Sequence, residues 1–93
     1  MNRRTTIAAA VGLHARPAAL LASAAAGQPA AVTIAKVTDD RPGDPVDASS
    51  VLGLMTLGAR QGEQVELSSE SAEALDELVA LLERDLDEEP AAT

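Results

Sequence analysis

Aromatic residues and cysteine are both absent from this chain of 93 residues. Without cysteine there are no disulfides and no thiolate metal sites, and an intracellular location is the economical interpretation. Without aromatic rings, the core must come from aliphatic side chains and methionine, and the usual stacking groups for single-stranded nucleic acid are missing. No run approaches the roughly 18 apolar residues that a membrane span needs. We therefore expect a small cytoplasmic protein with no membrane insertion.

Negative charge is concentrated in the last third of the sequence. Residues 1–60 carry a net charge of +2 and residues 61–93 a net charge of −10. An acidic chain repels phosphate backbones, so we expect no nucleic-acid partner. The acidic stretch is interpreted as a solvated helix face, followed by a disordered tail at residues 89–93. Residues 1–88 are expected to form one domain.

The pattern of apolar residues predicts four strands and three helices in the order β-α-β-β-α-β-α. The expected strands are Arg4 to Ala10, Ala30 to Val37, Val46 to Ala48 and Glu63 to Ser68. The first expected helix runs from Pro17 to Ala26, and the second is a short helix that is capped by Ser49 or Ser50 and ends at Gly58. The third begins at Ser71 and carries, at helical spacing, Leu75, Leu78, Val79, Leu82 and Leu86. Residues Thr38 to Pro45 are expected to form a long hairpin connection, and Pro45 places the strand after it at a sheet edge. The order predicts an α+β fold: an open-faced β-sandwich with a four-stranded antiparallel sheet and three helices on one face.

His14 is the only histidine in the chain, and it stands just ahead of a helix started by Pro17. The first amides of a helix have no intrahelical acceptor and carry a partial positive charge, so an anion attached to the ring could receive their hydrogen bonds. Arg16 adds a full positive charge two residues away. The arrangement suits a phosphoryl group carried on the ring. A zinc site would need more ligands than His14 supplies, so we expect no metal.

Two segments resemble one known family. "GLHARPA", from Gly12 to Ala18, is similar to the active-site signature of HPr, the histidine-containing phosphocarrier family of the phosphoenolpyruvate-dependent sugar phosphotransferase system. "SVLGLMTLGARQG", from Ser50 to Gly62, is similar to the regulatory-serine helix of that family and the turn after it. With the matching element order, the resemblance covers roughly residues 4 to 86.

The resemblance implies a phosphoryl carrier rather than an enzyme. Enzyme I would place the group on Nδ1 of His14, and the carrier would pass it to enzyme II A domains. Arg16 would be the charge partner of the phosphate, and the helix start at Ala15, Arg16, Pro17 and Ala18 would bind it. The resemblance implies no cofactor, and we expect a monomer.

The resemblance also assigns a regulatory and a partner-binding surface. Ser50 matches the regulatory serine, although a helix N-cap is the simpler interpretation of a serine there. Ala19, Leu52 and Met55 would bind the partner proteins, whereas Val51, Leu54 and Leu57 are interpreted as core.

Two other functions stay open at this point. One is a regulatory docking module of the same fold, controlled through Ser50. The other is a small acid–base enzyme using His14, since a neutral imidazole titrates near physiological pH. The sequence names neither the sugar nor the enzyme II partner.

Overall fold

The computed structural model describes residues 1–8 and 15–83. In chain order its elements are β1 (Asn2–Thr6), α1 (Ala15–Ala26), β2 (Val32–Thr38), β3 (Arg41–Pro42), β4 (Val46–Asp47), α2 (Val51–Leu57), β5 (Gln64–Ser69) and α3 (Ala72–Leu82). This order confirms the predicted α+β fold, with one additional short strand.

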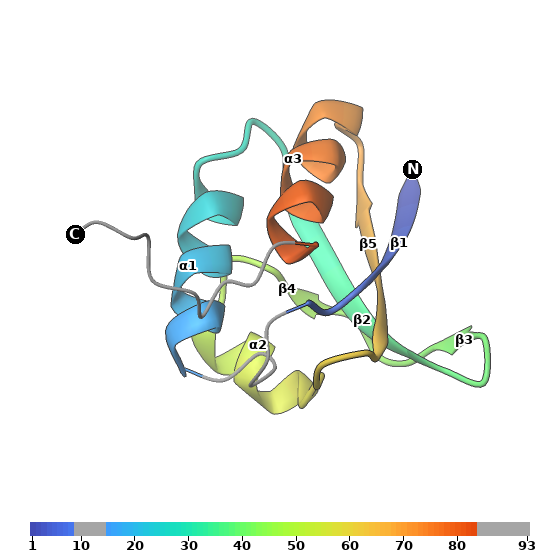
Figure 1. Cartoon of the computed structure of the whole chain (residues 1–93). Coiled ribbons are helices and arrows are strands. Elements are labelled where there is room, and N and C mark those ends of the chain that lie inside the picture. The colour runs from blue at the N-terminus through green and yellow to red at the C-terminus, as the bar shows by residue number, and fades with distance from the viewer. Residues whose placement is uncertain (9–14, 84–93) are drawn as a thin grey trace.

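The strands form one antiparallel sheet, and the three helices cover one of its faces (Figure 1). The strand order is β1-β5-β2-β3, and β4 also pairs with β2. β3 pairs with the C-terminal end of β2 and β4 with its N-terminal half, so the two short strands share one edge of the sheet. The sheet therefore has five strands where the sequence predicts four, because the short strand β3 forms within the segment expected to be a loop. The edge position expected for the strand after Pro45 is confirmed.

The core lies between the sheet and the helices. In β2 and β5, alternate side chains point toward the helices: Ile34 pairs with Leu67, and both are fully buried. The helices contribute Leu21, Leu54, Leu75, Leu78 and Leu82, each at most 1% exposed. Burial of one such side chain contributes about 1.5–3 kcal/mol, so these aliphatic residues form the core in the absence of aromatic rings.

The connection between β2 and β3 is shorter than predicted. Asp39 and Asp40 form its two central residues, with φ angles of 51° and 66°. Two positive φ values are what a type I′ turn requires, and aspartate tolerates this region better than most residues. The chain then enters β3, and the Gly43 N–H donates to the Lys36 carbonyl at 2.8 Å. The long hairpin connection expected over Thr38 to Pro45 is therefore wrong: a tight turn and a broken edge strand occupy it.

The helix boundaries agree with the sequence except at the start of α1 and at the end of α3, which stops at Leu82 although the expected helix carries Leu86. α1 begins at Ala15, two residues before the predicted start at Pro17, and ends at Ala26 as expected. Proline fits the first turn of a helix because its missing N–H would have no intrahelical partner there. Ser71 caps α3, accepting the Ala74 N–H at 3.2 Å. Leu86 and the tail at 89–93 lie outside the described residues.

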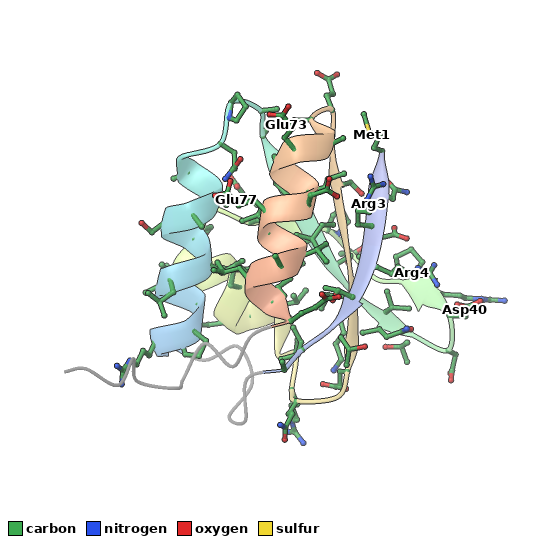
Figure 2. All side chains as sticks on the ribbon, turned by 45° about the horizontal axis from the view of Figure 1, so that its top comes forward. Met1, Arg3, Arg4, Asp40, Glu73 and Glu77 are labelled. Carbon is green, nitrogen blue, oxygen red and sulfur yellow. The ribbon has the colours of Figure 1, made fainter. Side chains whose placement is uncertain are left out.

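Acidic side chains are unevenly distributed over the helices. α1 and α2 contain no acidic residue, whereas α3 carries Glu73, Asp76 and Glu77 on its exposed side. Figure 2 shows Glu73 and Glu77 on α3. Asp76 also lies 3.4 Å from Nε of Arg3, which joins α3 to β1. The helix layer thus has one acidic member and two without negative charge.

Candidate functional site

The first turn of α1 brings together the residues predicted to bind phosphate. α1 begins at Ala15, and Arg16, Pro17 and Ala18 follow within the same turn. Pro17 and Ala18 are buried, which fixes the helix start against the core, whereas Arg16 is exposed. His14 lies outside the described residues, so its predicted role stays a prediction.

The composition of α1 explains why the helix forms so close to His14. Alanine has the highest helix propensity, and seven of the twelve residues of "ARPAALLASAAA" are alanine. No acidic residue stands in the first turn. The partial positive charge of the helix N-terminus and the guanidinium of Arg16 therefore act without a competing carboxylate from α1 itself.

Ser50 is the N-cap of α2. Its Oγ accepts the Gly53 N–H at 3.0 Å, and its φ and ψ of −101° and 114° are the extended values of a capping residue. Gly58 ends the helix in the left-handed conformation, with φ 69°. Ser50, rather than Ser49, is therefore the cap, which resolves the alternative left open by the sequence.

Ser49 makes a different contact. Its hydroxyl donates to Oδ1 of Asp47 at 2.6 Å, and its N–H donates to the same oxygen at 2.9 Å. The hydroxyl and then the backbone hydrogen bond lower the pKa of Asp47 below its usual value. Asp47 thus holds Ser49, and Ser50 is left to cap α2.

Exposed apolar side chains gather on α1 and α2, which pack against each other. Of the three predicted partner-binding residues, Leu52 is 77% exposed, Met55 is 43% exposed and Ala19 is also exposed. Leu20 and Val51 are exposed as well, at 48% and 37%. We call these five residues the apolar patch.

One residue of the apolar patch was expected in the core, and another was not predicted as a partner-binding residue. Val51 was expected in the core, but it stands at the first position of α2 and is turned to the surface, whereas Leu54 is fully buried. Leu57 is half-buried and packs against the core, as expected. Leu20 was missed, although the sequence carries a signal for it: the buried residues Ala18, Leu21, Ala22 and Ala25 recur at helical spacing, and Leu20 lies off that face.

Two hollows lie beside Gly43, away from the predicted site residues. One of about 250 Å³ is lined by Lys36, Gly43, Asp44, Val46, Thr56 and Leu57. The other, of about 170 Å³, is lined by Thr33, Ala35, Pro42, Gly43, Pro45, Glu66 and Ser68. The segment joining β2 to β4 contributes to both hollows, so they belong to the edge of the sheet.

Two further features of the structure bear on other functions. Among residues 1–8 and 15–83, no group of three or more histidine, cysteine or acidic side chains could hold a metal ion. Over the same part of the chain, none of the helices is long and apolar enough to cross a membrane.

Comparison with known proteins connects this geometry to one family. Residues 1–84 match the family model described as the PTS HPr component phosphorylation site. The phosphocarrier protein HPr of Streptomyces coelicolor is 44% identical over 96% of this chain and 95% of its own length. That of Cupriavidus necator is 40% identical over 88% of this chain and 90% of its own length.

Solved structures agree in both fold and sequence. The crystal structure of HPr from Thermoanaerobacter tengcongensis has a TM-score of 0.78 and 35% identity, covering 97% of this chain and 99% of that one. The HPr structure from Bacillus anthracis has a TM-score of 0.77 and 33% identity, covering 88% and 95%. The match along nearly the whole chain, in sequence and in fold, shows that this protein belongs to the HPr phosphocarrier family of the phosphotransferase system.

Proposed function

We propose that this protein accepts a phosphoryl group from phospho-enzyme I on Nδ1 of His14 and passes it to enzyme II A domains. The observation that carries the proposal is the start of α1 at Ala15, directly after His14 in the sequence. In each transfer the nitrogen lone pair attacks phosphorus while the bond from phosphorus to the donor breaks. The acceptor ring must therefore be neutral, which a positive helix N-terminus favours.

Arg16 and the first amides of α1 would hold the phosphoryl group. One helix-terminal interaction contributes about 0.3–1 kcal/mol, a scale that stabilises a carried phosphate without trapping it. Arg16 would add a charge-assisted hydrogen bond from the exposed side of the first turn. This division of roles suits a carrier, which must both accept and release the group.

The apolar patch would dock the partner proteins, with Arg16 as the charged contact beside it. α1 and α2 contain no carboxylate, so an acidic partner meets no negative side chain from either helix. We infer that the protein acts as a cytoplasmic monomer, with enzyme I and the enzyme II A domains as successive partners.

Ser50 enters the proposal in two ways. Its hydrogen bond to Gly53 favours a capping role, which needs nothing beyond this chain. A regulatory role through phosphorylation, with the protein acting as a docking module, stays the alternative. It is supported by the position of Ser50 next to two residues of the apolar patch, Val51 and Leu52.

Incubation with enzyme I and phosphoenolpyruvate tests the proposal. The wild-type protein should gain the mass of one phosphate in an acid-labile linkage, and His14→Ala should gain none while keeping its far-ultraviolet circular dichroism. Arg16→Ala should be phosphorylated more slowly, because the acceptor remains but a charge contact is lost. Phosphorylation of the His14→Ala protein by enzyme I would contradict the assignment of the acceptor.

A further inference from the structure

Met55 carries the only sulfur atom of the apolar patch. It is 43% exposed, and its neighbours Val51 and Leu52 on α2 are exposed as well, whereas Leu54 is fully buried. The Met55 carbonyl accepts the Gly58 N–H at 3.2 Å, so its backbone is fixed at the end of the helix. Solvent therefore reaches this residue in the folded protein, without any opening of the core.

Few side chains of this protein react readily with a peroxide. The chain has two methionines, Met1 and Met55, and it lacks cysteine, tryptophan and tyrosine. The two thioethers are therefore the side chains that a peroxide oxidises most readily here. Met1 is 62% exposed and precedes β1, away from α2, as Figure 1 shows for the N-terminus and Figure 2 for Met1. Oxidation of Met1 would leave the apolar patch unchanged, so it serves as an internal comparison.

We propose that Met55 is a site of reversible oxidation by hydroperoxides, and that its sulfoxide weakens the docking of partner proteins. The inference rests on the function proposed above, since it concerns the patch that would dock enzyme I. The sulfur lone pair attacks the terminal peroxide oxygen and forms the S–O bond while the O–O bond breaks. The proton of the attacked oxygen passes to the leaving oxygen, which departs as water or an alcohol. Sulfur is oxidised and the peroxide is reduced.

The new oxygen would change the chemistry of the patch more than its shape. A sulfoxide oxygen is a hydrogen-bond acceptor that water satisfies in the free protein. The other four residues of the patch, Ala19, Leu20, Val51 and Leu52, have no side-chain donor to replace that water. A partner that buries the patch must therefore desolvate a polar group without compensation. Because Met55 is exposed, the same oxygen disturbs no buried contact and should leave the fold intact.

Three proteins test the inference: the wild type, Met55→Leu and Met1→Leu. Each is treated with hydrogen peroxide and freed of it, and peptide mass mapping then locates the added oxygen. The kcat/KM for phosphoryl transfer from phospho-enzyme I is compared with that of the untreated sample of the same protein, so a changed basal rate does not affect the comparison. Melting is followed by circular dichroism. Methionine sulfoxide reductases specific for each sulfoxide epimer then reverse the oxidation.

We expect oxidation of Met55 to lower kcat/KM about five- to fiftyfold in the wild type and Met1→Leu, with unchanged melting temperatures. Treated and untreated Met55→Leu should have equal rates, and the reductases should restore transfer by the wild type.

Three results would overturn the inference: a Met55 that stays unoxidised while Met1 reacts, normal transfer by protein oxidised at Met55, or an equal loss of transfer in treated Met55→Leu. A lower melting temperature on oxidation of Met55 would also overturn it, because loss of the fold would then explain the slower transfer. An untreated wild-type protein that accepts no phosphoryl group would instead overturn the proposed function.

Discussion

Nη1 of Arg4 lies 2.6 Å from Oδ1 of Asp40, so a side chain on β1 holds the turn between β2 and β3 across the intervening strand β5 (Figure 2). On the way, Nε of Arg4 donates to Oε1 of Glu66 on β5 at 3.1 Å. The hydrogen bonds with Glu66 and then Asp40 raise the pKa of the Arg4 guanidinium. The turn that replaces the predicted long loop is therefore tied to the far side of the sheet.

Asp40→Ala and Asp40→Gly separate the ion pair from the backbone conformation. Both remove the carboxylate, but only alanine keeps a Cβ at a φ of 66°. We expect Asp40→Ala to be less stable than Asp40→Gly by about 1 kcal/mol, because a left-handed residue with a Cβ is strained. Urea unfolding followed by circular dichroism measures the difference, and an alanine variant at least as stable as the glycine variant would contradict the turn geometry.

Ser50→Ala should destabilise the protein by about 1 kcal/mol, because the Gly53 N–H loses its acceptor at the helix start. Ser49→Ala, the control on the adjacent hydroxyl, removes the contact to Asp47 but no cap, so it should cost less. Thermal melting by circular dichroism compares the two. A larger loss for Ser49→Ala would show that the two serines have been assigned in the wrong order.

The Ser50→Asp substitution should weaken docking to the partner proteins without lowering the stability of the fold. A carboxylate can still accept the amide and is favoured at a helix N-terminus, so the melting temperature should be kept or slightly raised. Transfer from enzyme I should weaken, because the new charge lies beside Leu52 and must be desolvated or meet an acidic partner. Melting and transfer kinetics measured on one preparation decide the matter: unchanged kinetics would place Ser50 outside the docking surface.

Leu52→Ala and Leu54→Ala form a second matched pair on α2. Leu54 is fully buried, so its truncation should cost about 2–5 kcal/mol of unfolding free energy. Leu52 is 77% exposed, so its truncation should barely change stability but lower the transfer rate about three- to tenfold. Denaturation and phosphotransfer assays on both proteins give the comparison. Normal transfer by Leu52→Ala would remove Leu52 from the apolar patch as a docking residue.

Glu63 makes part of the stability depend on pH. The backbone hydrogen bond from Arg60, followed by the contact with Lys36, lowers the pKa of Glu63 below its ordinary value of 4.5. A carboxylate whose pKa is lower in the folded state stabilises the fold above the unfolded pKa. This contribution is lost as the pH falls through the folded value.

We therefore expect the melting-temperature difference between wild type and Glu63→Gln to be largest near about pH 7 and to shrink by about pH 3. Glu70→Gln is the control, because Glu70 is an exposed carboxylate with no hydrogen bond or ion pair to the described residues. Its difference from the wild type should change less over the same range. A Glu63→Gln difference independent of pH would show that the contacts of Glu63 do not stabilise its charge.

The sequence predicts this fold well where periodicity and capping agree. The alternation of Val65 and Leu67, and the caps at Ser50 and Ser71, depend on neighbouring residues alone, so they can be recognised without coordinates. The type I′ turn could not be predicted from the local sequence, because the contact between Arg4 and Asp40 that ties it to the sheet forms only in the folded chain. That contact joins residues far apart in the sequence.

The candidate site also has features that local sequence predicts and features that depend on the folded chain. The start of α1 depends on a local pattern, and the sequence places it within two residues, whereas the role of His14 stays a prediction. The exposure of Val51 depends on how α2 lies against the core, and its helical spacing from Leu54 gives no sign of which of the two is buried.

The broken edge of the sheet has a consequence for the behaviour of the protein in concentrated solution. An uninterrupted outer strand offers a row of unpaired amides to which another chain can add, and such intermolecular pairing begins ordered aggregation. Here Pro42 and Pro45, which have no N–H, interrupt one border around Gly43, and β1 at the other border carries Arg3 and Arg4. Both borders are therefore poor templates for a second sheet, which helps keep the protein dispersed at high concentration.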